Sequence, residues 1–116
     1  MDGQVQAAGQ GVFAQVGMDP PLNAIFAQVR DIWVAQAPPG EARSYSALST
    51  MLSEYIVAGG GMAVAPQNVS QWATGSGGRR PPWHVVMLLC SLTGYRLVAT
   101  AAEWRVEPLP SGEREA

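Results

Sequence analysis

Residues 65–82 of the chain read A-P-Q-N-V-S-Q-W-A-T-G-S-G-G-R-R-P-P. Pro66 suits the first position of a helix, where its missing N–H costs no hydrogen bond, and Gly75 suits the residue just past a helix end. This stretch therefore predicts a short helix over residues 66–74, followed by a glycine-rich turn and two arginines. We expect the function to lie in this helix and in the arginines that follow it.

The predicted helix has an unusual surface, because its polar side chains carry no charge. Val69 and Trp72 are three residues apart and share one face, which predicts that they anchor the helix to the core. The other positions carry amides and a hydroxyl, from Gln67, Asn68, Ser70 and Gln71. Gln and Asn can make two hydrogen bonds to adenine, and Ser can bind several base edges. These four residues are the candidates for reading DNA bases, and an ordinary surface helix is the alternative interpretation.

The two arginines, Arg79 and Arg80, stand directly before two prolines at the expected start of another helix. A guanidinium group near a helix start can bind phosphate oxygens beside free backbone N–H groups. We therefore predict that both arginines contact the DNA backbone, with a solvated turn as the plainer alternative. Trp72 is expected to be a core anchor rather than a base-stacking residue.

The pattern Val69-Ser70-x-Trp72-x-x-Gly75, followed by Arg79-Arg80-Pro81-Pro82, resembles the second half of the helix-turn-helix in the lambda-repressor-like (Cro/cI, XRE-type) family. The resemblance covers roughly residues 44–94. It implies that the helix over 66–74 enters the major groove of DNA and that the basic loop lies along the backbone. The predicted phosphate-binding set also includes Ser44 and Tyr45. The implied function is a sequence-specific regulator of transcription that binds double-stranded DNA, in the first instance a repressor.

Two helices are predicted before the polar one. Apolar residues at helical spacing follow Asp19, a good N-cap, and this first helix ends before Pro38. Ser44 or Ser46 can cap the second helix, which the resemblance identifies as the first helix of the motif. Ser49 then falls where the family prefers a small residue, because the two helices approach closely there.

The connection between the two helices of the motif departs from the family. A helix-turn-helix usually has a turn of about three or four residues, whereas this segment runs from Val57 to Val64 and contains three consecutive glycines. Beyond the arginines, residues 83–93 predict a helix that is apolar around much of its circumference and needs cover on several sides.

The fold class predicted from these elements is mainly α, a four-to-five-helix lambda-repressor-like domain with a short C-terminal β-strand or hairpin. We divide the chain into a flexible segment over 1–18, the helix-turn-helix domain over 19–94, a β segment over 95–107 and a flexible tail over 108–116. The β segment is predicted to join two copies in a homodimer, because an unpaired strand edge is a liability. Its predicted interface residues are Leu97, Ala99, Trp104 and Val106.

The composition of the chain limits the classes of function that it can have. The net charge of −2 is unusual for a DNA-binding protein, but residues 55–102 contain three arginines and no Asp or Glu. A single cysteine and a single histidine give no internal disulfide and no metal cluster of known spacing. The sequence also lacks a phosphate-binding P-loop, a nucleophile elbow and a long apolar run. We therefore expect a cytoplasmic protein that is not an enzyme, does not contact membranes and has no cofactor.

A second functional class fits the same sequence. A protein-interaction module, such as an antitoxin or a phage-encoded adaptor, can use this fold and its C-terminal strand to hold a protein partner. The net acidity and the long turn favour this alternative.

Overall fold

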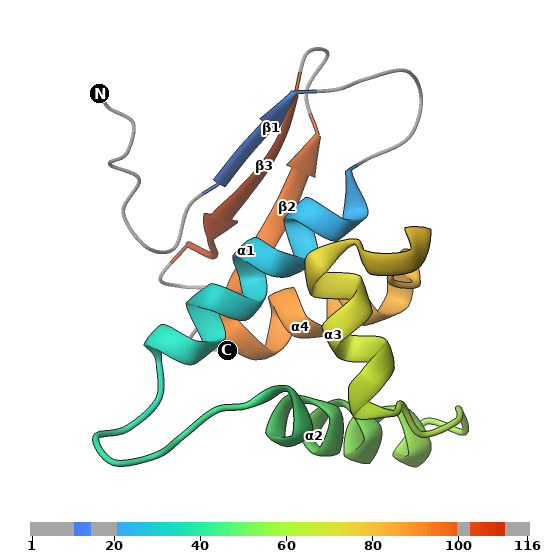
Figure 1. The fold of residues 1–116 in the computed structure, drawn as a ribbon. Coiled ribbons are helices and arrows are strands. Elements are labelled where there is room, and N and C mark those ends of the chain that lie inside the picture. The colour runs from blue at the N-terminus through green and yellow to red at the C-terminus, as the bar shows by residue number, and fades with distance from the viewer. Residues whose placement is uncertain (1–10, 15–20, 100–102, 111–116) are drawn as a thin grey trace.

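The structure is a computed structural model that describes residues 11–14, 21–99 and 103–110. In these residues four α-helices pack beside a small antiparallel sheet (Figure 1). In chain order the elements are β1 (Gly11–Ala14), α1 (Leu22–Ala35), α2 (Tyr45–Ala58), α3 (Pro66–Thr74), the 3-10 turn η1 (Ser76–Gly78), α4 (Trp83–Thr93), β2 (Tyr95–Ala99) and β3 (Glu103–Pro108). The mainly helical class and the C-terminal hairpin agree with the sequence prediction.

The core is shared by all four helices and the hairpin. In α1, Phe26 is fully buried and meets the ring of Trp72 edge to face, with the ring centroids 5.9 Å apart. The indole of Trp83 at the start of α4 meets Trp104 of β3 in the same way, also at 5.9 Å. Such pairs add about 0.5 to 1.5 kcal/mol beyond the area that they bury. The two aromatic pairs therefore tie α3 to α1 and β3 to α4.

The sheet has the strand order β1-β3-β2, so the strand near the N-terminus pairs with the last strand (Figure 1). The prediction of a flexible segment over 1–18 is wrong for residues 11–14, which pair antiparallel with β3 and bring Phe13 opposite Trp104. The pairing satisfies backbone N–H and C=O groups that the edge of β3 would otherwise leave unpaired. A strand of four residues is too short to show a recognisable pattern in the sequence. The rest of the predicted segment lies outside the described residues.

The C-terminal boundary also differs from the prediction. Pro108 belongs to β3 rather than to a tail, and the Leu109 N–H donates to the carbonyl oxygen of Gly94 at 3.0 Å. This bond joins the residue after β3 to the residue before β2, at the open end of the hairpin. Residues 111–116 of the predicted tail lie outside the described part of the chain.

The predicted dimer-interface side chains mostly cover the chain's own core. Cross-strand pairing places Leu97 opposite Val106 and Ala99 opposite Trp104, so all four side chains share one face of the hairpin. Val106 is only 1% exposed, and Leu97 and Trp104 pack against the core cluster. The prediction is therefore wrong for Val106, because the hairpin folds back onto its own helices. Of the four residues, only Ala99 is exposed.

Cys90 lies on the inner side of α4 and is 1% exposed. Burial raises the pKa of its thiol from 9.0 to about 11. The unfolded chain therefore loses this proton at lower pH than the folded chain, so the thiol's contribution to stability is complete below about pH 9 and disappears as the pH rises to about 11.

We expect the free energy of unfolding, measured with urea, to fall more steeply between pH 9 and pH 11 in the wild type than in Cys90→Ala. We also expect a thiol reagent at pH 8 to modify Cys90 only when denaturant is added. Equal pH dependence in both proteins, together with rapid modification of the folded chain, would contradict this burial.

Candidate nucleic-acid interface

The polar helix, α3, has the predicted bounds and the predicted anchors. Pro66 occupies its first turn, and Gly75 ends it in the left-handed conformation at φ 76°, with its N–H donating to Gln71 at 2.8 Å. Val69 is fully buried and Trp72 is 8% exposed. Both apolar residues therefore face the core, as their spacing predicted, and they fix which side of α3 faces outward.

The four predicted base-reading residues lie on the remaining sides of α3. Gln67 is exposed, whereas Asn68, Ser70 and Gln71 are half-buried. None of the four is buried in the core, so each keeps part of its polar surface accessible. Neutral amides and a hydroxyl in this arrangement can donate and accept hydrogen bonds toward a ligand without adding charge.

Glycines shape the long connection between α2 and α3. The N–H of Gly60 donates to Val57 at 2.9 Å and the N–H of Gly61 donates to Ile56 at 2.8 Å, which is the bond pattern of a Schellman cap. Gly60 has φ 94°, a conformation that glycine adopts without strain. A Cβ on Gly61 would lie 2.6 Å from the Ile56 side chain. The glycines therefore allow the chain to reverse tightly at the end of α2.

Two serines of α2 then hold the returning chain. The Ser49 hydroxyl donates to the carbonyl oxygen of Val64 at 2.5 Å. The Ser53 hydroxyl accepts the Val64 N–H at 2.8 Å and donates to the same carbonyl oxygen at 3.2 Å. The connection is longer than a usual helix-turn-helix turn, but these bonds return its end to α2. Pro66 consequently begins α3 beside α2, and α3 rises away from it (Figure 1).

We expect Ser53→Ala to lower the free energy of unfolding by about 1 kcal/mol, because the Val64 N–H loses its acceptor in a partly buried place. Ser49→Ala removes a bond to the same carbonyl and should have a smaller effect, since Ser53 still donates there. Urea unfolding measures both changes. Ser46→Ala, at an exposed position of the same helix, is the control. If Ser46→Ala lowered the free energy of unfolding as much as Ser53→Ala, the bonds to Val64 would not contribute to stability.

The arginine loop follows α3 directly. After η1 the chain continues through Arg79 and Arg80, both exposed, to Pro81, which is fully buried. The side-chain amide of Asn23 in α1 donates to the carbonyl oxygens of Trp72 at 2.8 Å and of Arg79 at 2.6 Å. The sequence reading missed Asn23, because only the tertiary fold brings α1 to both ends of this loop.

The arginine loop carries two adjacent positive charges at the surface. Four other arginines lie within 4.0 Å of a carboxylate, in the pairs Arg30–Asp31, Arg43–Glu41, Arg96–Glu107 and Arg105–Glu103. Arg79 and Arg80 are adjacent and exposed, in the stretch 55–102 that contains no acidic residue. Positive charge is therefore concentrated next to the C-terminal end of α3.

The other two predicted phosphate ligands, Ser44 and Tyr45, lie at the start of α2. The Ser44 hydroxyl caps this helix by accepting the Ala47 N–H at 3.1 Å, which leaves its own hydrogen for an anion. The half-buried ring of Tyr45 lies under the Arg30 guanidinium, 4.7 Å from the ring centroid. The structure thus places Arg30, which the sequence reading did not assign and which also pairs with Asp31, beside this helix end.

Comparisons with protein-family models, with curated proteins and with solved structures find no match to this chain. Within residues 11–14, 21–99 and 103–110, no three or more His, Cys, Asp or Glu side chains are grouped to hold a metal ion. No helix in these ranges is both long enough and apolar enough to cross a membrane.

Proposed function

We propose that this chain is a sequence-specific regulator of transcription that binds double-stranded DNA through a lambda-repressor-like helix-turn-helix. One observation carries the proposal. The short helix α3 is anchored by Val69 and Trp72, offers neutral polar side chains outward and leads directly into the exposed Arg79 and Arg80.

The arrangement of α2 and α3 supports this proposal. In a helix-turn-helix the second helix enters the major groove while the first crosses the DNA backbone. Ser49 and Ser53 bind the backbone of Val64, so the long connection still delivers the start of α3 next to α2. The extra residues of the connection therefore do not carry the start of α3 away from α2.

The proposed contacts divide into two kinds. Arg79 and Arg80 bind phosphate oxygens, with Ser44 and Tyr45 as further backbone contacts, and these bonds carry no sequence information. The α3 residues read the edges of the bases in the major groove. Their identities are Gln67, Asn68, Ser70 and Gln71.

A homodimer would double the number of base pairs that the protein reads. One short helix reads only a few base pairs, and two copies related by two-fold symmetry would read half-sites about 34 Å apart. Since Val106 is buried, we place the interface at the backbone of β2, whose outer edge has no partner strand in the described part of the chain. Antiparallel pairing centred on Leu97 would set Arg96 opposite Val98 and so avoid opposing like charges. A monomer mass in sedimentation at micromolar concentration would contradict this interface.

The experiment that tests the proposed function is selection of genomic DNA fragments by the purified protein, followed by binding measurements on the enriched duplex. We expect an enriched sequence that binds more tightly than unrelated duplexes, with an affinity that falls as salt rises. Absence of enrichment, combined with no salt-dependent binding to any duplex, would contradict the proposal.

A second candidate function rests on a different surface. Tyr55, Val57 and Met62 are 52%, 53% and 86% exposed around the end of α2 and the glycine turn. Val57 lines a shallow groove of about 520 Å³, together with Val64 and Pro66. Large exposed apolar side chains beside a groove can mark a protein-binding surface. Co-purification of a stoichiometric protein, without salt-dependent DNA binding, would favour a protein-interaction module instead.

A further inference from the structure

The side chain of Asn23 joins three parts of the fold at one point. Its NH₂ group donates to Trp72 in the last turn of α3 and to Arg79 beyond η1, at 2.8 and 2.6 Å. Both acceptors are carbonyl oxygens, so only the NH₂ end of the amide can serve them. One half-buried side chain of α1 therefore holds both ends of the segment 73–78.

The glycines of that segment lie in open space. Gly75, Gly77 and Gly78 all have positive φ, and a Cβ placed on any of them would meet no neighbouring heavy atom within 4 Å. Glycine also loses more conformational freedom on ordering than any other residue. Packing does not hold these glycines, so the position of the loop depends on hydrogen bonds within the segment and on the Asn23 bonds, which link its two ends to α1.

We infer that Asn23 is a positioning residue for the arginine pair, an inference that rests on the proposed function. The two arginines are bounded by the Asn23 bond to Arg79 on one side and by the buried Pro81 on the other. Held at both ends, their backbone has a fixed position relative to the outward face of α3. Phosphate contacts then need less ordering of the loop when DNA binds, which strengthens binding.

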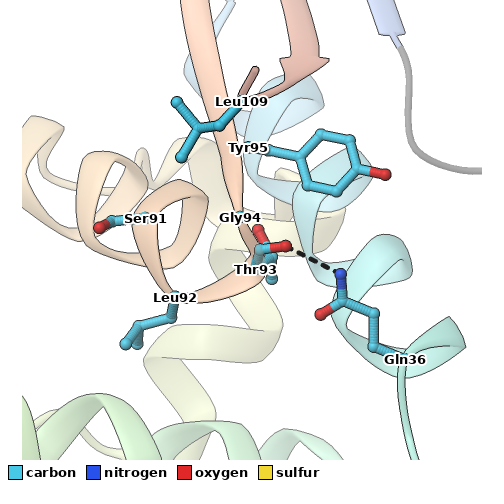
Figure 2. Close-up of a pocket in the computed structure, with 7 residues that line it drawn as sticks. All are labelled: Gln36, Ser91, Leu92, Thr93, Gly94, Tyr95 and Leu109. Carbon is cyan, nitrogen blue, oxygen red and sulfur yellow. Dashed lines mark hydrogen bonds between the residues drawn. The ribbon is translucent and has the colours of Figure 1, made fainter. Parts of the chain in front are cut away.

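The chain provides a matched control at the other end of α1. Gln36 also donates its side-chain amide to a backbone carbonyl, that of Thr93, at 2.8 Å (Figure 2). This bond lies beside a pocket lined by α4 and hairpin residues, not by the arginine loop. Gln36→Ala removes the same kind of bond between α1 and a distant segment and leaves Asn23 in place.

The test measures binding of the enriched duplex by the full chain in two backgrounds, the wild type and Arg79→Ala with Arg80→Ala. We expect Asn23→Ala to weaken binding about fivefold in the wild type, the equivalent of one lost hydrogen bond. In the background without the arginines it should have no further effect, since the contacts that it positions are gone. Gln36→Ala should leave binding unchanged in both backgrounds.

Hydrogen exchange of the free protein provides a readout that does not depend on DNA. The N–H groups of Gly78 and Arg79 donate within the loop, to Gly75 and Ser76. They should exchange faster in Asn23→Ala and in the isosteric Asn23→Asp, which cannot donate, but not in Gln36→Ala. If no duplex binds the wild type, the proposed function fails, while this exchange pattern still decides whether Asn23 holds the loop.

Three results would overturn the inference. The first is equal weakening by Asn23→Ala with and without the arginines, which would mean that it acts through general stability. The second is unchanged DNA affinity in Asn23→Ala. The third is unchanged exchange of Gly78 and Arg79 in both Asn23 variants.

Discussion

Replacing both Arg79 and Arg80 with alanine is expected to weaken binding to every duplex, specific or not, by about 60-fold at 0.1 M salt. Each phosphate contact contributes about 0.9 to the slope of log affinity against log salt concentration. Two lost contacts therefore lower the slope by about 1.8, and the loss accumulates over the tenfold range between 0.1 and 1 M salt. Fluorescence anisotropy on one enriched and one unrelated duplex, at several salt concentrations, measures both quantities.

Two variants that each lose one positive charge separate the effect of a phosphate contact from the effect of net charge. Arg79→Ala and Arg105→Ala remove the same charge, but Arg105 lies on β3 and pairs with Glu103 at 2.6 Å. We expect the first variant to lower the salt slope by about 0.9 and the second to leave it nearly unchanged. Equal slopes in the two variants would mean that the arginine loop is not a phosphate site.

Gln67→Ala and Gln71→Ala are each expected to weaken binding to the preferred site by about 1 to 3 kcal/mol, because a base edge loses its hydrogen-bonding partner. Unrelated duplexes, which are held by phosphate contacts, should bind almost as before. Competition between the enriched and unrelated duplexes measures the difference directly. Gln36→Ala, which removes a glutamine whose amide is bonded to α4, is the control.

These two sets of variants also test whether α3 provides sequence specificity while the arginine loop provides affinity for any duplex. If the glutamine and arginine variants lost specific and non-specific affinity in the same proportion, α3 would not be the reading element. A selective loss at single base positions in the glutamine variants would identify which bases each side chain contacts.

The bounds and the anchors of α3 were predicted from the sequence, because they depend on residues within this helix or directly beside it. Pro66 and Gly75 mark the two ends of α3, because each is favoured at one end by its own backbone conformation. Val69 and Trp72 are identified as anchors by spacing alone. Ser49 was predicted as a small residue at a close approach of two helices, but its bond to Val64 was not, although two serines four residues apart in α2 were a visible signal.

The features that the sequence did not reveal depend on contacts between distant residues. The roles of Asn23 and of β1 are set by segments that lie far away in the chain. Val106 was assigned to a dimer interface because an apolar strand can cover a partner or its own core equally well. Only the placement of the hairpin against the helices decides between the two.

The pairing of β1 with β3 has a consequence for how the molecule assembles. It joins Gly11 to Val106, almost the whole length of the chain, whereas the hairpin and the helix pairs join closer neighbours in sequence. Contacts between distant segments form late, because the entropy cost of closing the loop is met before the contact is made. β1 should therefore dock last and detach first, and until it docks β3 offers an open edge that the β1 strand of another copy can occupy.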